Sequence, residues 1–387
     1  MSATSSRGRQ PGRTAVGTWS GGRFMGFGAE VEPARLEAIL RPGGGIDTVI
    51  TADTYGQGDA DRMLGRALAG VERDRYALLG AVGHDFYEGE RAGAKGFPRF
   101  TDPDLRGPDA YAGYLRTAAE RSLERLGQDR FDLLLLHNPD RTGYSSETVW
   151  DGMAALREDG LAAAIGVAPG PANGFTLDLL DCFDRFGDRI DWAMVILNPL
   201  EPWPGELVLG AAAAHDVDVI TRVVDYGGLF WGDVTDVEDL PPRDHRRFRP
   251  DGWIEAGNAR IDAMRPIAEH NGLTPMQLAC RWNLAHPAVR CVVPTLIQES
   301  GPGARPIEDK RAELAALPEV ELGAEDVAAI RRIGDNTGSM ALKGASPRHE
   351  GEPLADAWPL DSGLLAAGER WGIEPERDLV KAEIKVR

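Results

Sequence analysis

The sequence predicts a single (β/α)8 barrel, an α/β fold in which eight parallel strands alternate with helices. Eight apolar segments, several rich in β-branched residues, are each followed by a segment with helical periodicity. The composition does not change along these eight units, and no Gly-x-Gly-x-x-Gly turn marks a doubly wound nucleotide-binding domain. A chain of 387 residues with 42% hydrophobic residues can bury one large core.

The predicted strands differ in how strongly the sequence marks them. Residues 46–51 are rich in β-branched side chains, and turn residues follow them. Residues 130–140 are almost wholly apolar until His137, a pattern that is typical of a parallel strand buried on both faces. The eight segments expected to contain the strands are 14–28, which runs on into a glycine-rich loop, 46–51, 75–82, 130–140, 162–170, 192–198, 216–225 and 289–297.

Helical spacing and end signals predict the segments between the strands. Pro33 stands in the first turn of one helix, and Gly160 follows the end of another. The predicted helices are 31–40, 59–68, 109–127, 145–160, 175–187, 205–216, 274–287 and 306–317. An insertion, residues 231–272, follows the seventh strand; it begins polar and proline-rich and then becomes helical, and loops of this length usually shape a pocket.

The ends of the chain differ in composition from the barrel. Residues 1–13 are expected to form a flexible tail, residues 14–335 the barrel, and residues 336–387 a C-terminal extension that ends in a helix-like stretch, 378–386. Three roles stay open for the extension: to cover the mouth of the barrel, to pair with a second copy in a homo-oligomer, or to remain mobile.

Charge and cysteine content exclude several classes of partner. A net charge of -18 argues against nucleic acid and against anionic membranes, both of which need a basic surface. No signal-type apolar region and no apolar run long enough for a membrane span occurs. The three cysteines, Cys182, Cys280 and Cys291, lie in apolar segments and do not have the spacing of metal ligands. The histidines show no metal-ligand spacing either. We therefore expect a cytoplasmic protein with a small-molecule substrate and no metal.

Tyr55 is the first candidate for catalysis. It follows the strand at 46–51 and precedes the helix at 59–68, so it lies at the carboxyl end of a barrel strand, where such folds place their chemistry. A tyrosine that merely anchors a turn is the alternative interpretation.

Several segments together resemble the aldo-keto reductase superfamily. They are GTWSGGRFMGFG, GIDTVITADTYGQGDADRMLGRAL, FDLLLLHNPD, AAIGVAPG and GLTPMQLACRWNLAHPAVRCVVP, and the resemblance extends over residues 14–335. It implies a TIM barrel and the reduction of aldehydes, ketones or sugars by NADPH. In that family an Asp, a Tyr, a Lys and a His form the catalytic tetrad at the barrel mouth.

The resemblance assigns only half of this tetrad. It places the tyrosine at Tyr55 and the histidine at His137, but Ile50 stands where the Asp is expected and Ala81 where the Lys is expected. In the family, the lysine ammonium favours the phenolate. Without it, Tyr55 should titrate close to an ordinary phenol, and hydride transfer should be slow. Arg222, at the end of the seventh strand, is a candidate replacement cation, and Asp53, Asp225 and His84 are weaker supporting candidates.

The cofactor contacts are altered as well. Ala168 and Pro169 stand at the family's Ser-Asn pair, and Met194 stands near its Gln, so the hydrogen bonds to nicotinamide are lost. At the phosphate end, Thr295, Arg305 and Lys310 are the candidate contacts, beside a helix start. Glu299, Glu308 and Asp309 in the same loop weaken its attraction for an anion. Binding of NADP(H) therefore stays open.

Three functions follow, in this order of preference. The first is a redox-neutral enzyme, a lyase, dehydratase or isomerase, in which Tyr55 and His137 transfer protons on a carbonyl or sugar-like compound. The second is an NADPH-dependent oxidoreductase in which Arg222 or a carboxylate compensates for the missing residues. The third is a non-catalytic binding protein on the same barrel.

Overall fold

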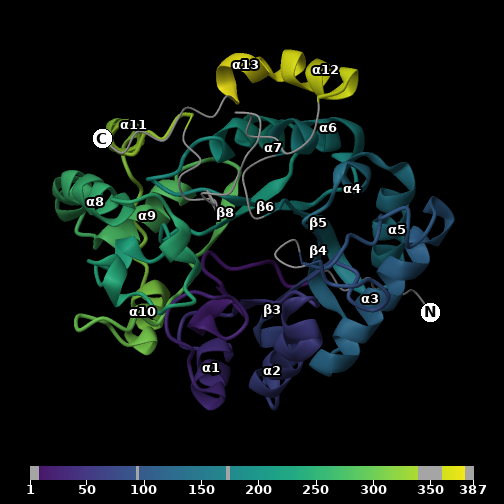
Figure 1. The fold of residues 1–387 in the computed structure, drawn as a ribbon, viewed down its shortest axis with the longest axis horizontal. Coiled ribbons are helices and arrows are strands. Elements are labelled where there is room, and N and C mark those ends of the chain that lie inside the picture. The colour runs from purple at the N-terminus through teal and green to yellow at the C-terminus, as the bar shows by residue number, and fades with distance from the viewer. Residues whose placement is uncertain (1–7, 93–95, 171–174, 339–359, 380–387) are drawn as a thin grey trace.

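The predicted (β/α)8 barrel is confirmed by the structure, a computed structural model that describes residues 8–92, 96–170, 175–338 and 360–379. Eight strands form one parallel sheet in chain order (Figure 1). Its two edges meet through a parallel bridge between Thr14 and Val292, and the Val292 N–H donates a 2.9 Å hydrogen bond to the Arg13 carbonyl. The strands are β1 (Val16–Gly17), β2 (Thr48–Ile50), β3 (Ala77–Val82), β4 (Phe131–His137), β5 (Ala162–Ala168), β6 (Trp192–Ile196), β7 (Asp218–Arg222) and β8 (Val289–Val293).

Helices surround the sheet. They are α1 (Pro33–Leu40), α2 (Asp59–Leu68), α3 (Tyr111–Leu126), α4 (Arg141–Ser145), α5 (Glu147–Glu158), α6 (Thr176–Phe186), α7 (Leu209–Ala214), α8 (Trp253–His270), α9 (Pro275–Leu284), α10 (Ile307–Ala315), α11 (Ala324–Ile333), α12 (Ser362–Trp371) and α13 (Pro375–Asp378). Their ends follow local chemistry: Thr274 and Gln277 form a reciprocal capping box at the start of α9, and Gly127 ends α3 in the left-handed region.

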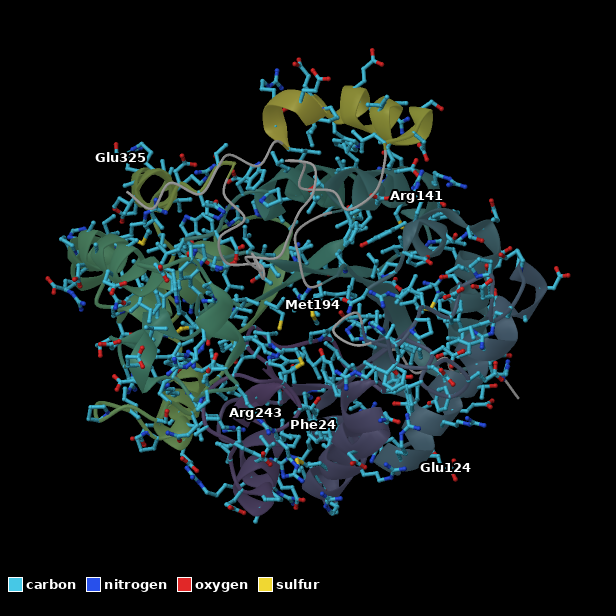
Figure 2. The ribbon with its side chains drawn as sticks, viewed as in Figure 1. Phe24, Glu124, Arg141, Met194, Arg243 and Glu325 are labelled. Carbon is cyan, nitrogen blue, oxygen red and sulfur yellow. The ribbon has the colours of Figure 1, made fainter. Side chains whose placement is uncertain are left out.

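The two faces of each strand pack into different cores. On β4, Leu133 and Leu135 belong to the cluster inside the barrel, whereas Leu134 and Leu136 belong to the cluster between the strands and the helices. Because successive side chains of a strand alternate in direction, His137 continues the inward series. The same alternation directs Met194 of β6 inward, and it lies near the centre of the view in Figure 2.

The insertion after β7 is partly helical, as predicted. It contains the short 3-10 helices Val237–Asp239 and His245–Phe248 and then α8, which packs against α9 and α11. The short α4 and the later α11 and α12 were not predicted. The helix-like stretch 378–386 lies outside the described residues from position 380 onward.

The chain ends contact the barrel wherever they are described. Residues 8–13, expected to belong to a flexible tail, lie against the amino ends of the strands: the Arg9 N–H donates to the Asp132 carboxylate at 2.8 Å. At the other end, α12 packs on α6 with Leu364 fully buried, and the Trp371 indole donates to the Asp184 carboxylate. The described part of the extension thus covers the outer side of α6 (Figure 1).

Two further observations concern the described residues as a whole. None of their helices combines the length and the apolar character that crossing a membrane requires. The three cysteines are buried and unpaired.

Candidate active site at the carboxyl ends of the strands

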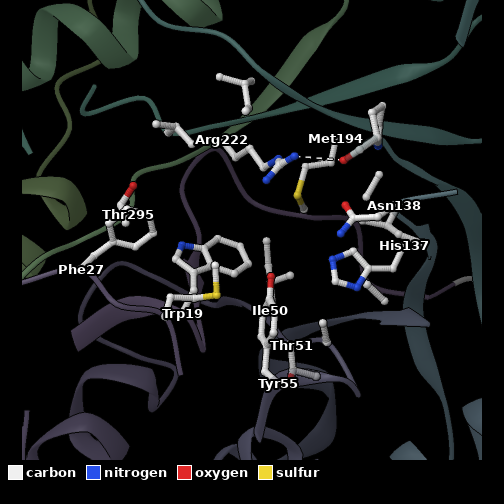
Figure 3. A pocket seen from close by; sticks show the side chains of 18 of the residues that line it. Trp19, Phe27, Ile50, Thr51, Tyr55, His137, Asn138, Met194, Arg222 and Thr295 are labelled. Atoms are coloured by element: carbon white, nitrogen blue, oxygen red, sulfur yellow. Dashed lines mark hydrogen bonds between the residues drawn. The ribbon is translucent and has the colours of Figure 1, made fainter. Parts of the chain in front are cut away.

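A cavity of about 540 Å³ opens where the strands end (Figure 3). The loop after β1 contributes Trp19, Met25 and Phe27 to its wall. The polar side chains that line it are Thr51, Tyr55, His137, Asn138, Glu201, Arg222, His245, Arg249 and Thr295. A largely apolar cavity with a few convergent polar groups is typical of a small-molecule site.

Tyr55 begins a 3-10 turn, Tyr55–Gly58, directly after β2. Its N–H donates to the Ala52 carbonyl at 3.0 Å, and the next residue, Gly56, has φ 57° with the Phe24 ring so close that a Cβ would lie 2.9 Å from it. Glycine is therefore required where the chain turns. Burial raises the pKa of the Tyr55 phenol, and the charge of Arg222 counteracts this only in part.

His137 ends β4 and faces Tyr55. Their rings meet edge to face, with centroids 5.8 Å apart. Nδ1 of His137 is buried and has no hydrogen-bond partner within the described part of the chain. Burial, followed by the nearby His84, Arg99 and Arg222, keeps the pKa of His137 well below its usual value, so the ring is neutral at pH 7.

The sequence prediction that joined Tyr55 and His137 in one pocket therefore agrees with their positions. Ile50, the last residue of β2, and Ala81, near the end of β3, line the same cavity, and both side chains are nearly fully buried. An apolar surface thus stands beside Tyr55 where the resemblance leads one to expect a carboxylate and an ammonium group.

Arg222 ends β7 and extends into the cavity (Figure 3). Its Nη2 donates to the carbonyls of Pro169 and Gly170, at 3.0 and 2.7 Å, while its Nε is buried without a partner among the described residues. The next residue, Val223, has φ 59°, a left-handed conformation that a β-branched residue rarely adopts. Such strain is concentrated at functional sites.

His84 lies behind His137 rather than in the cavity lining. Their ring centroids are 5.1 Å apart, and Arg99 Nη1 lies 2.9 Å from His84 Nδ1. Asn138 Nδ2 lies 3.0 Å from His84 Nε2. Burial first, and then the charge of Arg99, lowers the pKa of His84 to about 4. His84 therefore contacts His137 from behind and does not line the cavity.

Neither aspartate candidate replaces the lost carboxylate. Asp53 is fully buried and outside the cavity lining, and both of its carboxylate oxygens lack a hydrogen-bond partner in the described chain. Burial and the nearby Asp61 raise its pKa well above the usual value. Asp225 accepts the N–H groups of Thr295 and Leu296 and the Trp231 indole N–H, so it fixes the loop after β8.

Arg249 was missed by the sequence analysis. It lies in the insertion, lines the cavity and stacks over the Trp253 ring at 4.3 Å, and its Nη1 is buried without a partner within the described residues. Burial lowers its pKa to about 10, so the group is still charged at pH 7. Only the basic composition of the segment 243–249 signals such a residue, and it does not say which arginine faces inward.

The three candidates for the phosphate end have different environments. Thr295 lines the cavity. Arg305 pairs with Glu313 at 2.7 Å. Lys310 is fully buried, pairs with Asp233 at 2.7 Å and donates to the Ile297 carbonyl at 2.8 Å. Neither Arg305 nor Lys310 lines the cavity, so only Thr295 is placed beside the candidate catalytic pair.

The other anion-binding groups of this edge are already engaged. The Asp233 carboxylate accepts the Arg305 N–H, and Gln298 accepts the Ile307 N–H at the start of α10. Arg246 is fully buried between Asp244 and Glu299, at 2.7 Å from each. Because the chain's own acceptors occupy these donors, the residues present do not fit the diphosphate of a nicotinamide dinucleotide.

The fold is a (β/α)8 barrel, and the candidate residues Tyr55 and His137 lie at the carboxyl ends of its strands, the edge where such barrels carry their active sites. The sequence profile of the aldo/keto reductase family matches residues 16–335, and the chain belongs to this family. Among relatives, the 6-dehydroglucose reductase of Agrobacterium fabrum is 24% identical over 73% of this chain and 83% of that protein. An aldo-keto reductase of Mycolicibacterium smegmatis is 27% identical over 58% of this chain and 70% of its own.

Solved structures agree on the fold. The glycerol dehydrogenase of Gluconobacter oxydans superposes with a TM-score of 0.63 at 23% identity, over 85% of this chain and 95% of that one. The holo form of an aldo-keto reductase from Bacillus halodurans gives 0.60 at 20% identity, over 84% and 96%. An aldo-keto reductase of Klebsiella pneumoniae in complex with NADPH gives 0.52 at 21% identity, over 83% and 90%.

Proposed function

We propose that this protein catalyses a redox-neutral proton transfer beside a carbonyl group, leading to isomerisation or dehydration of a small carbonyl or sugar-like compound. The observation that carries the proposal is the apolar surface of Ile50 and Ala81 next to Tyr55. No lysine lines the cavity among the described residues, and burial raises the pKa of the Tyr55 phenol. Such a phenol holds its proton and acts as a hydrogen-bond donor.

The two facing rings suit an enolisation. The Tyr55 O–H donates a hydrogen bond to the carbonyl oxygen of the substrate. His137, which is unprotonated at pH 7, accepts a proton from the adjacent carbon; that C–H bond breaks, its electron pair forms an enolate, and the enolate charge offsets the imidazolium that burial disfavours. The charge of Arg222, which acts on Tyr55, stabilises the oxyanion.

Two outcomes then balance without an oxidant or reductant. If the adjacent carbon carries a hydroxyl group, return of the proton from His137 to the former carbonyl carbon gives an isomer: the Tyr55 O–H gives its proton to the old carbonyl oxygen and takes the proton of that hydroxyl, whose oxygen becomes the new carbonyl. Transfer of that proton to a β-hydroxyl group breaks the C–O bond and releases water, which is a dehydration. In both cases the protein ends in its starting protonation state.

The first step can be measured before the physiological substrate is known. The protein is incubated in D2O without nucleotide with hydroxyacetone, dihydroxyacetone, pyruvate and 2-oxobutyrate, and incorporation of deuterium next to the carbonyl is followed by NMR. We expect exchange above the buffer rate for at least one compound and its loss in Tyr55→Phe. Exchange that is equal in the variant would contradict the proposal.

The relatives favour a second candidate, an NADPH-dependent reductase, because their names include reductases and dehydrogenases. The same protein sample distinguishes the two. Fluorescence titration with NADPH and absorbance assays of its oxidation with the same carbonyl compounds should give no saturable binding and no turnover. Saturable binding coupled to turnover would replace the proton-transfer proposal with the reductase.

A further inference from the structure

The cavity contains more positive than negative charge. Arg222 and Arg249 line it, and Glu201 is its single acidic lining residue among the described residues. His137 and His245 also line the cavity, and His137 is neutral at pH 7 because its pKa is lowered. Two guanidinium groups therefore face one carboxylate.

Neither arginine is neutralised by an ion pair within the described chain. Within the described chain the hydrogen bonds of Arg222 go to the carbonyl oxygens of Pro169 and Gly170, which satisfy one nitrogen and carry no negative charge. Arg249 rests on the Trp253 ring. Each has a buried guanidinium nitrogen that finds no partner in the part of the chain that the structure describes: Nε of Arg222 and Nη1 of Arg249. A buried, charged donor without a partner is costly, and an anionic ligand would supply what it lacks.

Two other buried cations of the described chain are neutralised by carboxylates. Arg246, in the same insertion, lies between Asp244 and Glu299, and Lys310 pairs with Asp233. Arg281 of α9 is buried without an ion pair in the described chain, and its Nε and Nη2 have no partner there, but it does not line the cavity. Arg222 and Arg249 differ from Arg281 because they face a space that a ligand can enter.

We propose that the substrate carries an anionic oxygen group, a carboxylate or a phosphate, that Arg222 and Arg249 bind while its carbonyl faces Tyr55 and His137. Guanidinium groups suit this role because their planar donors match both anions. Glu201, whose charge acts on both arginines, lies in the same part of the cavity and sets a limit on the negative charge that the site accepts. The proposal rests on the proposed function for the placement of the carbonyl, but the binding of the anion can be tested without catalysis.

The test uses matched pairs of ligands that differ in charge. Isothermal titration compares pyruvate with methyl pyruvate, and dihydroxyacetone phosphate with dihydroxyacetone; oxalate and inorganic phosphate serve as simple anions in a thermal-shift assay. We expect at least one anion to bind about tenfold or more tightly than its neutral counterpart. The pyruvate arm favours a carboxylate substrate and the phosphate arm a phosphorylated one.

Variants connect the preference to the two arginines. Arg249→Gln should weaken binding of the anion about tenfold and leave the neutral ligand unchanged, whereas Arg249→Lys should retain part of the preference. Arg222→Gln should weaken binding of the anion more than binding of the neutral ligand, because Arg222 also acts near the carbonyl group. Arg243→Gln is the matched control, because it removes the same charge from an exposed position in the same insertion (Figure 2). Because Arg222 also holds two carbonyls, the melting temperature of each variant is measured first, and Arg249→Gln suffices if Arg222→Gln does not fold.

Each outcome is decisive. Equal affinity for the charged and neutral ligands, no stabilisation by any of the anions, or an equal loss in Arg243→Gln and Arg249→Gln would overturn the anion site. Arginine-dependent anion binding without deuterium exchange would leave the anion site in place and refute the proton-transfer function. Deuterium exchange on neutral compounds without any preference for anions would support the proton-transfer function and refute the anion site.

Discussion

At the scale of single residues, the site combines a donor that holds its proton with a base that lacks one. Burial acts on both in the direction of the neutral form: it raises the pKa of Tyr55 and lowers the pKa of His137. The apolar side chains of Ile50 and Ala81 maintain this state because they add no compensating charge. Proton transfer beside a carbonyl needs such a neutral pair, whereas a phenolate-based mechanism would not be supported here.

Tyr55→Phe tests the donor. Within the described chain, no hydrogen bond contributes to the pKa shift of the Tyr55 phenol. Removal of its oxygen therefore breaks no structural hydrogen bond of this kind and should change the free energy of unfolding by less than about 1.5 kcal/mol. The deuterium-exchange rate should fall by roughly a hundredfold or more, the contribution of a positioned acid. Full activity in a folded variant would show that Tyr55 only anchors the turn. His137→Ala should lower the rate similarly.

Ile50→Asp combined with Ala81→Lys tests the absent half of the tetrad. The introduced ammonium should lower the pKa of Tyr55, which an absorbance titration of tyrosinate can follow. We nevertheless expect no NADPH oxidation, because Asp233, Asp244 and Glu299 still engage the cations at the phosphate end. NADPH-dependent reduction by the double variant would show that the two tetrad positions alone determine the loss of redox chemistry.

Asp53 provides a prediction about stability. The pKa of Asp53 is raised in the folded state. Between the pKa of the unfolded chain and this raised pKa, the folded protein binds more protons than the unfolded chain. The stability of the folded protein therefore decreases as the pH rises through this range. At pH 7 Asp53→Asn should therefore increase the free energy of unfolding by about 1 kcal/mol or more. The difference should shrink as the pH is lowered. Urea unfolding at several pH values measures it, and a destabilised variant at pH 7 would contradict the assignment.

At the scale of elements, the C-terminal helix α12 behaves as part of the barrel. Leu364 is fully buried against the helix layer, while its neighbour Leu365 is 48% exposed. The Asp361 side chain caps α12 by accepting the Leu364 N–H, and the same carboxylate pairs with Arg141 before α5. The extension is therefore attached at its cap and through its apolar face.

Leu364→Ala should reduce the free energy of unfolding by about 2 to 3 kcal/mol if α12 unfolds together with the barrel, because it removes a buried side chain and leaves a cavity. Leu365→Ala is the control, and an exposed position of this kind should change stability by less than about 0.5 kcal/mol. Both are read from chemical denaturation. Equal and small effects would mean that α12 detaches before the barrel unfolds.

At the scale of the whole molecule, the parts that the sequence predicted are those governed by periodicity. The apolar run of β4 and the predicted helix 59–68, which is α2, correspond to the structure closely, and Tyr55 and His137 share one cavity because parallel strands end at one edge. Arg249 could not be predicted, since no period relates a loop residue to the pocket. The orientation of the Asp53 side chain could not be predicted either, because the turn after β2 determines that it is buried outside the cavity lining.

The dependence of global stability on pH offers a last test. The pKa of His84 is about 4 in the folded protein, against about 6.5 in the unfolded chain, so below pH 6.5 the unfolded chain binds more protons and stability decreases as the pH falls. His84→Asn removes this contribution while other titrating groups stay unchanged. The variant should be less stable at pH 7, where it lacks the contacts to Arg99 and Asn138. Between pH 6.5 and 4 the difference should narrow by up to about 3 kcal/mol. A difference that is independent of pH would show that His84 has the same pKa in the folded and the unfolded protein, and would contradict the lowered value.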